Sequence, residues 1–157
     1  MPKRLSPEEA KVKILRYCAY QERSHQEVKD KLYSFGLYSS DVNEIISYLI
    51  TEGFLNEERY AKAFVGGKFR MKKWGKLKIV RELEGKGLTA NCIRIGLREI
   101  DQADYLKSLQ SIIQKKSEEI DEPNLFAMRN RVARFAMQKG YEPELVWREV
   151  KELLPDR

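Results

Sequence analysis

The feature that most constrains the fold of this chain is an internal repeat marked by three glycines. Gly36, Gly87 and Gly140 are separated by 51 and then 53 residues. Apolar residues recur at the equivalent positions: Val28, Ile79 and Val132 eight before each glycine, Leu32, Leu83 and Ala136 four before, Val42, Ile93 and Val146 six after, and Ile46, Leu97 and Val150 ten after. The two positions before each glycine share one face of a helix. A repeat of about 50 residues buries little core alone, so we expect three tandem units.

Capping signals predict three helices in each unit. Residues 6–9, Ser-Pro-Glu-Glu, combine an N-cap, a proline at the first helical position and a capping-box glutamate, and residues 24–27 repeat the box. Glycines 36, 53, 87 and 140 stand where left-handed C-caps end helices. The predicted helices cover residues 7–21, 25–35, 41–52, 57–72, 76–86, 90–101, 103–119, 124–139 and 143–154. The sequence therefore predicts an all-α fold of three three-helix repeats at residues 1–55, 56–101 and 102–157.

The net charge of +6 lies entirely in the middle repeat. Residues 1–55 carry 8 basic and 8 acidic groups, residues 56–101 carry 12 and 6, and residues 102–157 carry 10 and 10. An excess that only kept the protein in solution would be spread over all three repeats. The clustering indicates a surface for a polyanion or an acidic protein.

Helical spacing separates core positions from surface positions in the middle repeat. The predicted core stripe consists of Tyr60, Phe64, Met71, Ile79, Val80 and Leu83. The candidate binding residues lie outside it or among the cations: Lys62, Lys68, Phe69, Arg70, Lys72, Lys73, Trp74, Lys76, Lys78 and Arg81. Two interpretations stay open. The aromatic pair either packs between repeats or anchors a partner, and the cations either contact a partner or form a solvated face.

Several other classes of protein lack their motifs in this sequence. No apolar run approaches the roughly 18 residues of a membrane span, and the opening MPKRLSPEEA has no apolar signal segment. We therefore expect a cytoplasmic protein. Cys18, Cys92 and the single histidine, His25, match no disulfide or zinc pattern, and both thiols are expected in cores. Without a phosphate-loop, HExxH or GxSxG motif, the sequence predicts no enzyme, no cofactor and no metal site.

Four strings cover parts of all three repeats: SHQEVKDKLYSFGL (24–37), GFLNEERYAKAFV (53–65), WGKLKIVRELEGKGL (74–88) and RVARFAMQKGYEPELV (131–146). They resemble the RecX family of regulatory proteins, which modulate the RecA recombinase. The most specific pattern is aromatic-glycine, a basic residue before isoleucine, Glu-Leu and Lys-Gly, which Trp74, Gly75, Lys78, Ile79, Glu82, Leu83, Lys86 and Gly87 match. Lys76 departs from the family, where proline is common.

The resemblance implies an elongated, curved array that binds in the groove of a RecA filament as a monomer. It implies restraint of strand exchange, ATP hydrolysis and SOS induction, with DNA contacted through its backbone if at all, and it implies no catalysis. The alternative is a helix-turn-helix-like protein acting directly on DNA, because three-helix units have that general form. The third helix of each repeat is not strongly basic, so we favour the filament regulator.

Overall fold

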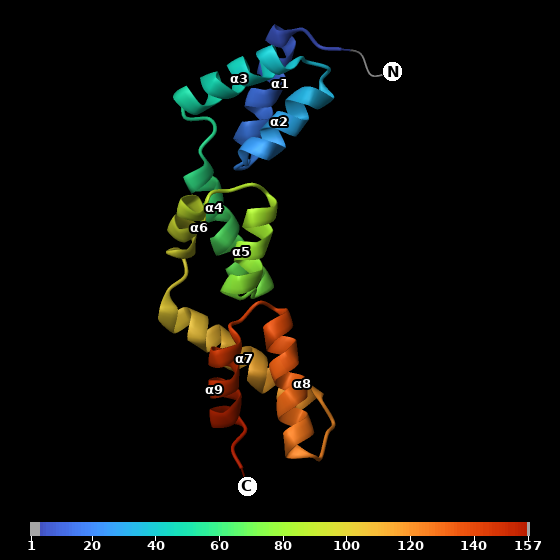
Figure 1. The fold of residues 1–157 in the computed structure, drawn as a ribbon, viewed down its shortest axis with the longest axis vertical. Helices are drawn as coiled ribbons and strands as arrows, with labels where there is room; N and C mark the ends of the chain where they lie inside the picture. The colour runs from blue at the N-terminus through green and yellow to red at the C-terminus, as the bar shows by residue number, and fades with distance from the viewer. Residues whose placement is uncertain (1–3, 157) are drawn as a thin grey trace.

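The computed structural model describes residues 4–156, which form nine α-helices and one π-helix and contain no strand. The first unit holds α1 (Pro7–Tyr20), α2 (His25–Ser34) and α3 (Ser39–Thr51). The second holds α4 (Glu57–Gly67), the π-helix η1 (Lys68–Lys72), α5 (Lys76–Gly85) and α6 (Ala90–Leu97). The third holds α7 (Gln102–Glu119), α8 (Leu125–Gln138) and α9 (Pro143–Leu153). Figure 1 shows the units in a row along one long axis, with the two ends of the chain at opposite ends of the molecule. The all-α fold of three tandem three-helix units is confirmed.

The helix ends follow the capping chemistry expected from the sequence. The Ser6 hydroxyl accepts a bond of 3.2 Å from the Glu9 amide, and Ser24 accepts one of 3.1 Å from Glu27. Both capping boxes are complete. All four glycines predicted as C-caps have positive φ angles, between 78° and 105°. We retain residues 1–55, 56–101 and 102–157 as the proposed limits of the units.

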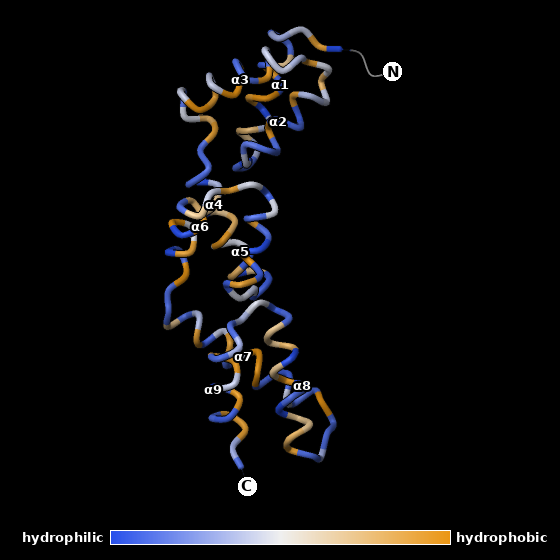
Figure 2. Tube along the Cα trace, viewed as in Figure 1, coloured by the Kyte–Doolittle hydropathy of each residue, from blue (hydrophilic) through white to orange (hydrophobic). Residues whose placement is uncertain are grey.

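The buried side chains form two clusters rather than three. The first unit has a core of its own, built from Ala10, Ile14, Val28, Leu32, Leu37, Val42, Ile45, Leu49 and Leu55. The second and third units share one continuous cluster, which runs from Tyr60 and Ile79 through Tyr105 to Tyr141 and Val150. In Figure 2 apolar residues are interspersed with polar ones along the helices, as expected for helices that bury one face in these clusters. The second and third units are thus joined by a common core, and the first unit is not.

Both cysteines are partly buried against these cores, Cys18 against the first and Cys92 against the second. Burial raises the pKa of the Cys18 thiol, and the nearby Arg23 guanidinium opposes this with a smaller effect. Both thiols therefore lie at core margins, close to the expected position.

Polar contacts join the first unit to the second. The Glu57 carboxylate accepts a bond of 3.1 Å from the His25 amide and lies 3.5 Å from the imidazole of His25. Arg59 forms an ion pair with Glu22 and donates a bond of 3.0 Å to the carbonyl of Gly53. This joint depends on charges and hydrogen bonds that water can replace.

Backbone contacts join the second unit to the third. The Gly75 amide donates a bond of 2.7 Å to the carbonyl of Lys139, and the Leu77 amide donates one of 2.9 Å to Gly140. A Cβ atom on Gly75 would lie 2.2 Å from the carbonyl carbon of Gly140, so only glycine permits this approach. Gly75 of the aromatic-glycine pair therefore has a structural role, because its close approach to Gly140 docks the second unit on the third.

One predicted helix changes type within its length. The sequence predicts a single helix over 57–72, but the α-helix ends at Gly67 and continues as a π-helix until Lys73, which has a left-handed φ of 59°. A π-helix widens the turn and rotates later side chains relative to α-helical positions. Met71, predicted to face the core, is consequently 83% exposed.

Candidate partner-binding surface

The exposed cations of the candidate surface occupy three elements of the second unit. Lys62 lies on α4, Arg70 and Lys72 on η1, Lys73 just after it, and Arg81 on α5, all with exposed side chains. Among residues 4–156, none of the eight candidate cations between 62 and 81 forms an ion pair. Their positive potential is therefore not neutralised by salt bridges within the described chain.

Two of the other candidate residues, Lys68 and Lys78, lie over the ring of Trp74. The Lys68 ammonium lies 5.0 Å and the Lys78 ammonium 4.5 Å from the ring centroid, within cation–π range. The indole also packs edge-on against Phe64 with centroids 6.4 Å apart. Since these contacts occupy its surface and it is only partly exposed, Trp74 packs within the unit and positions lysines.

Lys76 is tied to the third unit. Its amide donates a bond of 2.9 Å to the Tyr105 hydroxyl, and its ammonium donates one of 3.2 Å to the side chain of Gln102. The same ammonium lies 4.6 Å from the centre of the Tyr105 ring. These contacts make Lys76 a structural link between units, and they leave it fewer donors for a partner than its exposed neighbours have.

Two tyrosines of the third unit lie against the cationic segment 69–76. The Tyr105 hydroxyl donates to Glu142, and the Tyr141 hydroxyl donates a bond of 3.1 Å to the carbonyl of Lys73. Burial, above all other effects, raises the pKa of both phenols, which therefore stay neutral at physiological pH. The Lys139 ammonium adds a bond of 3.1 Å to the carbonyl of Lys72.

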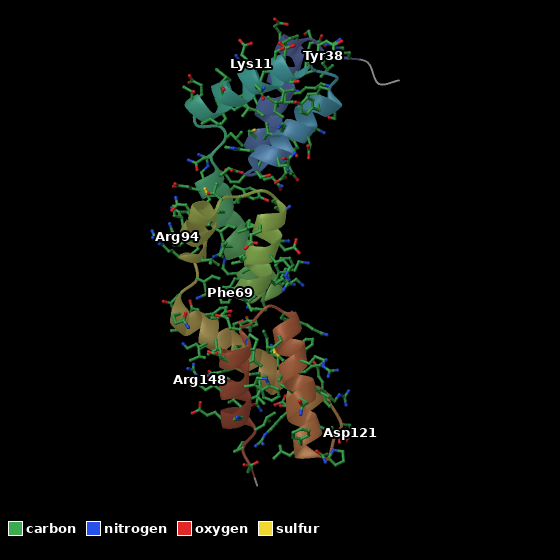
Figure 3. All side chains as sticks on the ribbon, viewed as in Figure 1. Lys11, Tyr38, Phe69, Arg94, Asp121 and Arg148 are labelled. Atoms are coloured by element: carbon green, nitrogen blue, oxygen red, sulfur yellow. The ribbon has the colours of Figure 1, made fainter. Side chains whose placement is uncertain are left out.

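A groove at the same junction contains candidate residues together with residues that the sequence analysis missed. It has a volume of about 540 Å³ and is lined by Phe69, Arg70, Lys73, Asp104, Lys107, Ser108, Ser111, Ile112, Lys115 and Lys139. Figure 3 labels Phe69 at this level, between the second and third units. Its ring is partly buried, 5.9 Å from the centroid of Tyr105.

The cations of the groove that the sequence analysis missed are Lys107, Lys115 and Lys139, all from the third unit. The third unit carries equal numbers of basic and acidic groups, so its net charge gave no sign of them. Lys107, Ser111 and Lys115 follow one another at intervals of four, a spacing that places them along one face of a helix. This spacing was the available signal. Of the candidates, Phe69, Arg70 and Lys73 join the groove, whereas Lys62, Lys72 and Arg81 lie outside its lining.

Residues 4–156 contain no group of three or more histidine, cysteine, aspartate or glutamate side chains placed to hold a metal ion. In the same range, no helix combines the length and apolar character needed to cross a bilayer.

These features define a tandem three-helix repeat protein with a cationic middle unit docked on the third. Three family models match it, one for each unit: the first, second and third three-helix domains of RecX, over residues 10–49, 56–97 and 103–150. The chain belongs to the RecX family.

Curated relatives carry the name Regulatory protein RecX. The one from Bacillus cereus (strain G9842) is 24% identical over 150 residues, covering 96% of this chain and 56% of the relative. The one from Clostridium tetani (strain Massachusetts / E88) is 28% identical over 142 residues, covering 89% of this chain and 63% of the relative. The chain thus spans somewhat over half the length of these proteins.

Two crystal structures share the fold. That of RecX from Lactobacillus salivarius matches with a TM-score of 0.85 at 22% identity, covering 94% of this chain and 96% of the other. A structure of a regulatory protein RecX matches with a TM-score of 0.82 at 19% identity, covering 96% and 72%. At these identities the matches establish architecture, and function has to be argued from the surface.

Proposed function

We propose that this protein binds the nucleoprotein filament of the RecA recombinase, as a monomer in the cytoplasm, and restrains its ATP hydrolysis, strand exchange and SOS-inducing activity. The observation that carries the proposal is the set of exposed cations at Lys62, Arg70, Lys72, Lys73 and Arg81, which have no ion-pair partner among residues 4–156. A protein with such a surface attracts nucleic acid or an acidic protein, and a filament of recombinase on DNA presents both.

The shape of the molecule supports the same function. Its three units extend in a row (Figure 1), and an extended body contacts several subunits of a helical filament at once. Linking three weak contacts in one chain raises the effective concentration of each for the others. Inhibition then follows if the bound array prevents neighbouring subunits from changing their relative positions during turnover.

The direct test measures ATP turnover by the recombinase on single-stranded DNA. Lys72→Glu combined with Arg81→Glu changes two exposed cations and leaves the Lys78–Trp74 contact intact. We expect the wild-type protein to suppress turnover and this variant to need at least about tenfold more protein for the same effect, since two charge contacts become repulsive. Lys13→Glu with Lys29→Glu, exposed in the first unit, is the control of equal charge change. Equal potency of both variants and the wild type would contradict the assigned surface.

The alternative, a helix-turn-helix-like DNA reader, is disfavoured by the third helices. Helix α3 contains no basic residue and α6 contains only Arg94, while the two cations of α9 stand among three glutamates. A helix that reads bases in the major groove is placed there by cations on the phosphates at its flanks. The α6 backbone also packs closely on α4, since a Cβ on Gly96 would lie 3.0 Å from backbone atoms of Ala61.

A further inference from the structure

The groove at the junction of the second and third units concentrates unneutralised positive charge. Five of its lining residues are cations: Arg70, Lys73, Lys107, Lys115 and Lys139. None of the five forms an ion pair within residues 4–156, and the acidic member of the lining is Asp104. The charges come from both units, so the groove exists only when the units are docked.

The groove is also preformed. Its walls are held by the bond from Lys139 to the carbonyl of Lys72, by the Tyr141 bond to Lys73, and by a bond of 2.9 Å between the hydroxyls of Ser108 and Tyr141. Phe69 is fixed against Tyr105. A ligand that enters does not have to order these residues, and the entropic cost of binding is correspondingly lower.

We propose that this groove binds the sugar–phosphate backbone of single-stranded nucleic acid. Four of the five cations are lysines, which neutralise phosphates as point charges and lack the planar fork that pairs with a carboxylate. Phe69 and Ile112 supply an aromatic and an apolar surface, on which unpaired bases can stack and on which paired bases cannot. An acidic protein segment would use the charges but would need no stacking surface.

The length of the groove distinguishes a strand from an isolated phosphate. Lys107 and Lys115 are eight residues apart on α7, which corresponds to about 12 Å at the rise of an α-helix. That distance exceeds the spacing of about 3.4 Å or more between successive nucleotides along a strand. The lysines therefore contact different phosphates of one chain. The hydroxyls of Ser108 and Ser111 lie in the same lining and can donate to phosphate oxygens between them.

This proposal rests on the proposed function only in that Arg70 and Lys73 belong to the same candidate surface. It adds a ligand that the protein binds without the recombinase. The test therefore uses the full chain and a fluorescently labelled oligothymidylate, with binding followed by anisotropy at several salt concentrations. Lys107→Glu with Lys115→Glu changes two exposed groove residues that the filament test leaves untouched.

We expect this double variant to bind the strand at least about tenfold more weakly at low salt, with a log–log salt slope shallower by about 1.4, since two phosphate contacts are lost. The double variant Lys107→Arg with Lys115→Arg keeps both charges and should bind the strand about as tightly as the wild type. Lys13→Glu with Lys29→Glu should change affinity by less than about threefold, because these charges lie in the first unit. Circular dichroism checks that every variant keeps its helical content.

Three outcomes would overturn the proposal. Unchanged strand binding by the folded Glu variant would show that the groove takes no strand. Loss of filament inhibition with strand binding intact would identify an acidic protein surface as the ligand, and the proposed function would still stand. Inorganic phosphate that competes as strongly as the oligonucleotide, at equal phosphate concentration, would identify a site for a single phosphate. Loss of strand binding with filament inhibition intact supports the groove and separates it from the filament surface.

Discussion

Two glycines of the junction touch through their backbones, and each has a different reason to be glycine. Gly75 has an ordinary extended conformation, but a Cβ there would lie 2.2 Å from the carbonyl carbon of Gly140. Gly140 has a φ of 105°, and a Cβ there would lie 2.4 Å from the Cβ of Lys78. The repeat analysis singled out Gly140 as a C-cap, and the close approach of the two glycines is the second constraint on it.

Gly75→Ala should therefore separate the second and third units. The clash is with backbone atoms that cannot rotate away, so we expect a loss of about 2–4 kcal/mol in the free energy of unfolding, measured with urea. Gly67→Ala is the matched control, because a Cβ there meets nothing within 4 Å and its φ and ψ are helical. The control should gain about 0.5–1 kcal/mol. If Gly75→Ala and Gly67→Ala changed the free energy of unfolding in the same direction, the docking geometry would be refuted.

Tyr105 makes the junction sensitive to alkaline pH. Burial, and then the bond to Glu142, raise the pKa of its phenol above the unfolded value of about 10. The neutral phenol is favoured in the folded state, so its contribution to stability is complete below about pH 10 and is lost as the pH rises further. Tyr105→Phe leaves Glu142 and the Lys76 amide without this partner.

We expect Tyr105→Phe to lower the free energy of unfolding at neutral pH by about 1–3 kcal/mol. Between pH 7 and about 11 the variant should then lose less stability than the wild type, because one of the shifted phenols is gone. Urea unfolding at the two pH values measures both effects. A steeper alkaline loss in the variant would contradict the assigned role of Tyr105.

At the scale of the element, the π-helix η1 is the least regular part of the fold. It ends at Lys73, whose left-handed φ of 59° is costly for a residue with a side chain. The carbonyl of Lys73 is held by Tyr141 and that of Lys72 by Lys139, so the third unit maintains this conformation. Strained backbone maintained from outside is common where a segment has a binding role.

Lys73→Gly should raise the free energy of unfolding by about 1 kcal/mol, since glycine adopts the left-handed region freely. Its binding to single strands should nevertheless weaken, because one groove cation is lost. Lys73→Val removes the same charge and adds a β-branched side chain, so it should destabilise the protein instead. Urea unfolding and strand binding, measured on both variants, separate the two effects. Lower stability in the glycine variant would show that the backbone at Lys73 is unstrained.

Helix positions were largely predictable because caps and glycines act locally. The complete capping boxes at Ser6 and Ser24 and the left-handed glycines are set by a few neighbouring residues. The π-helix was not predictable, since widening the turn depends on contacts with the distant Lys139 and Tyr141. The exposure of Met71 follows from that change. The groove was missed for a similar reason, because its walls come from two repeats and only the fold brings them together.

At the scale of the whole molecule, the repeat and the core divide the chain differently. The repeat pattern alone favours a stable pair of units after a cut at Asp101. The structure places the boundary between independently packed parts near Leu55 instead, because the second and third units share one core and the first has its own. The joint at that point consists of ion pairs and hydrogen bonds such as Arg59–Glu22 and His25–Glu57. Salt and water weaken such contacts far more than a shared core.

We therefore expect residues 56–157 to fold without the first unit, and residues 1–101 to lose order in the second. In residues 1–101, Tyr60 and Ile79 still have the buried residues of the second unit around them. They lose the part of the cluster that Tyr105 and Tyr141 contribute from the third unit. Far-ultraviolet circular dichroism with urea titration should show a cooperative transition for 56–157. For 1–101 it should show a transition of the first unit alone, with a smaller dependence on urea concentration.

Raising the salt concentration should leave the stability of 56–157 almost unchanged, while the first unit becomes freer to reorient in the full chain. Cooperative unfolding of 1–101 as one body, with 56–157 unfolded, would place the division of the molecule at Asp101 after all.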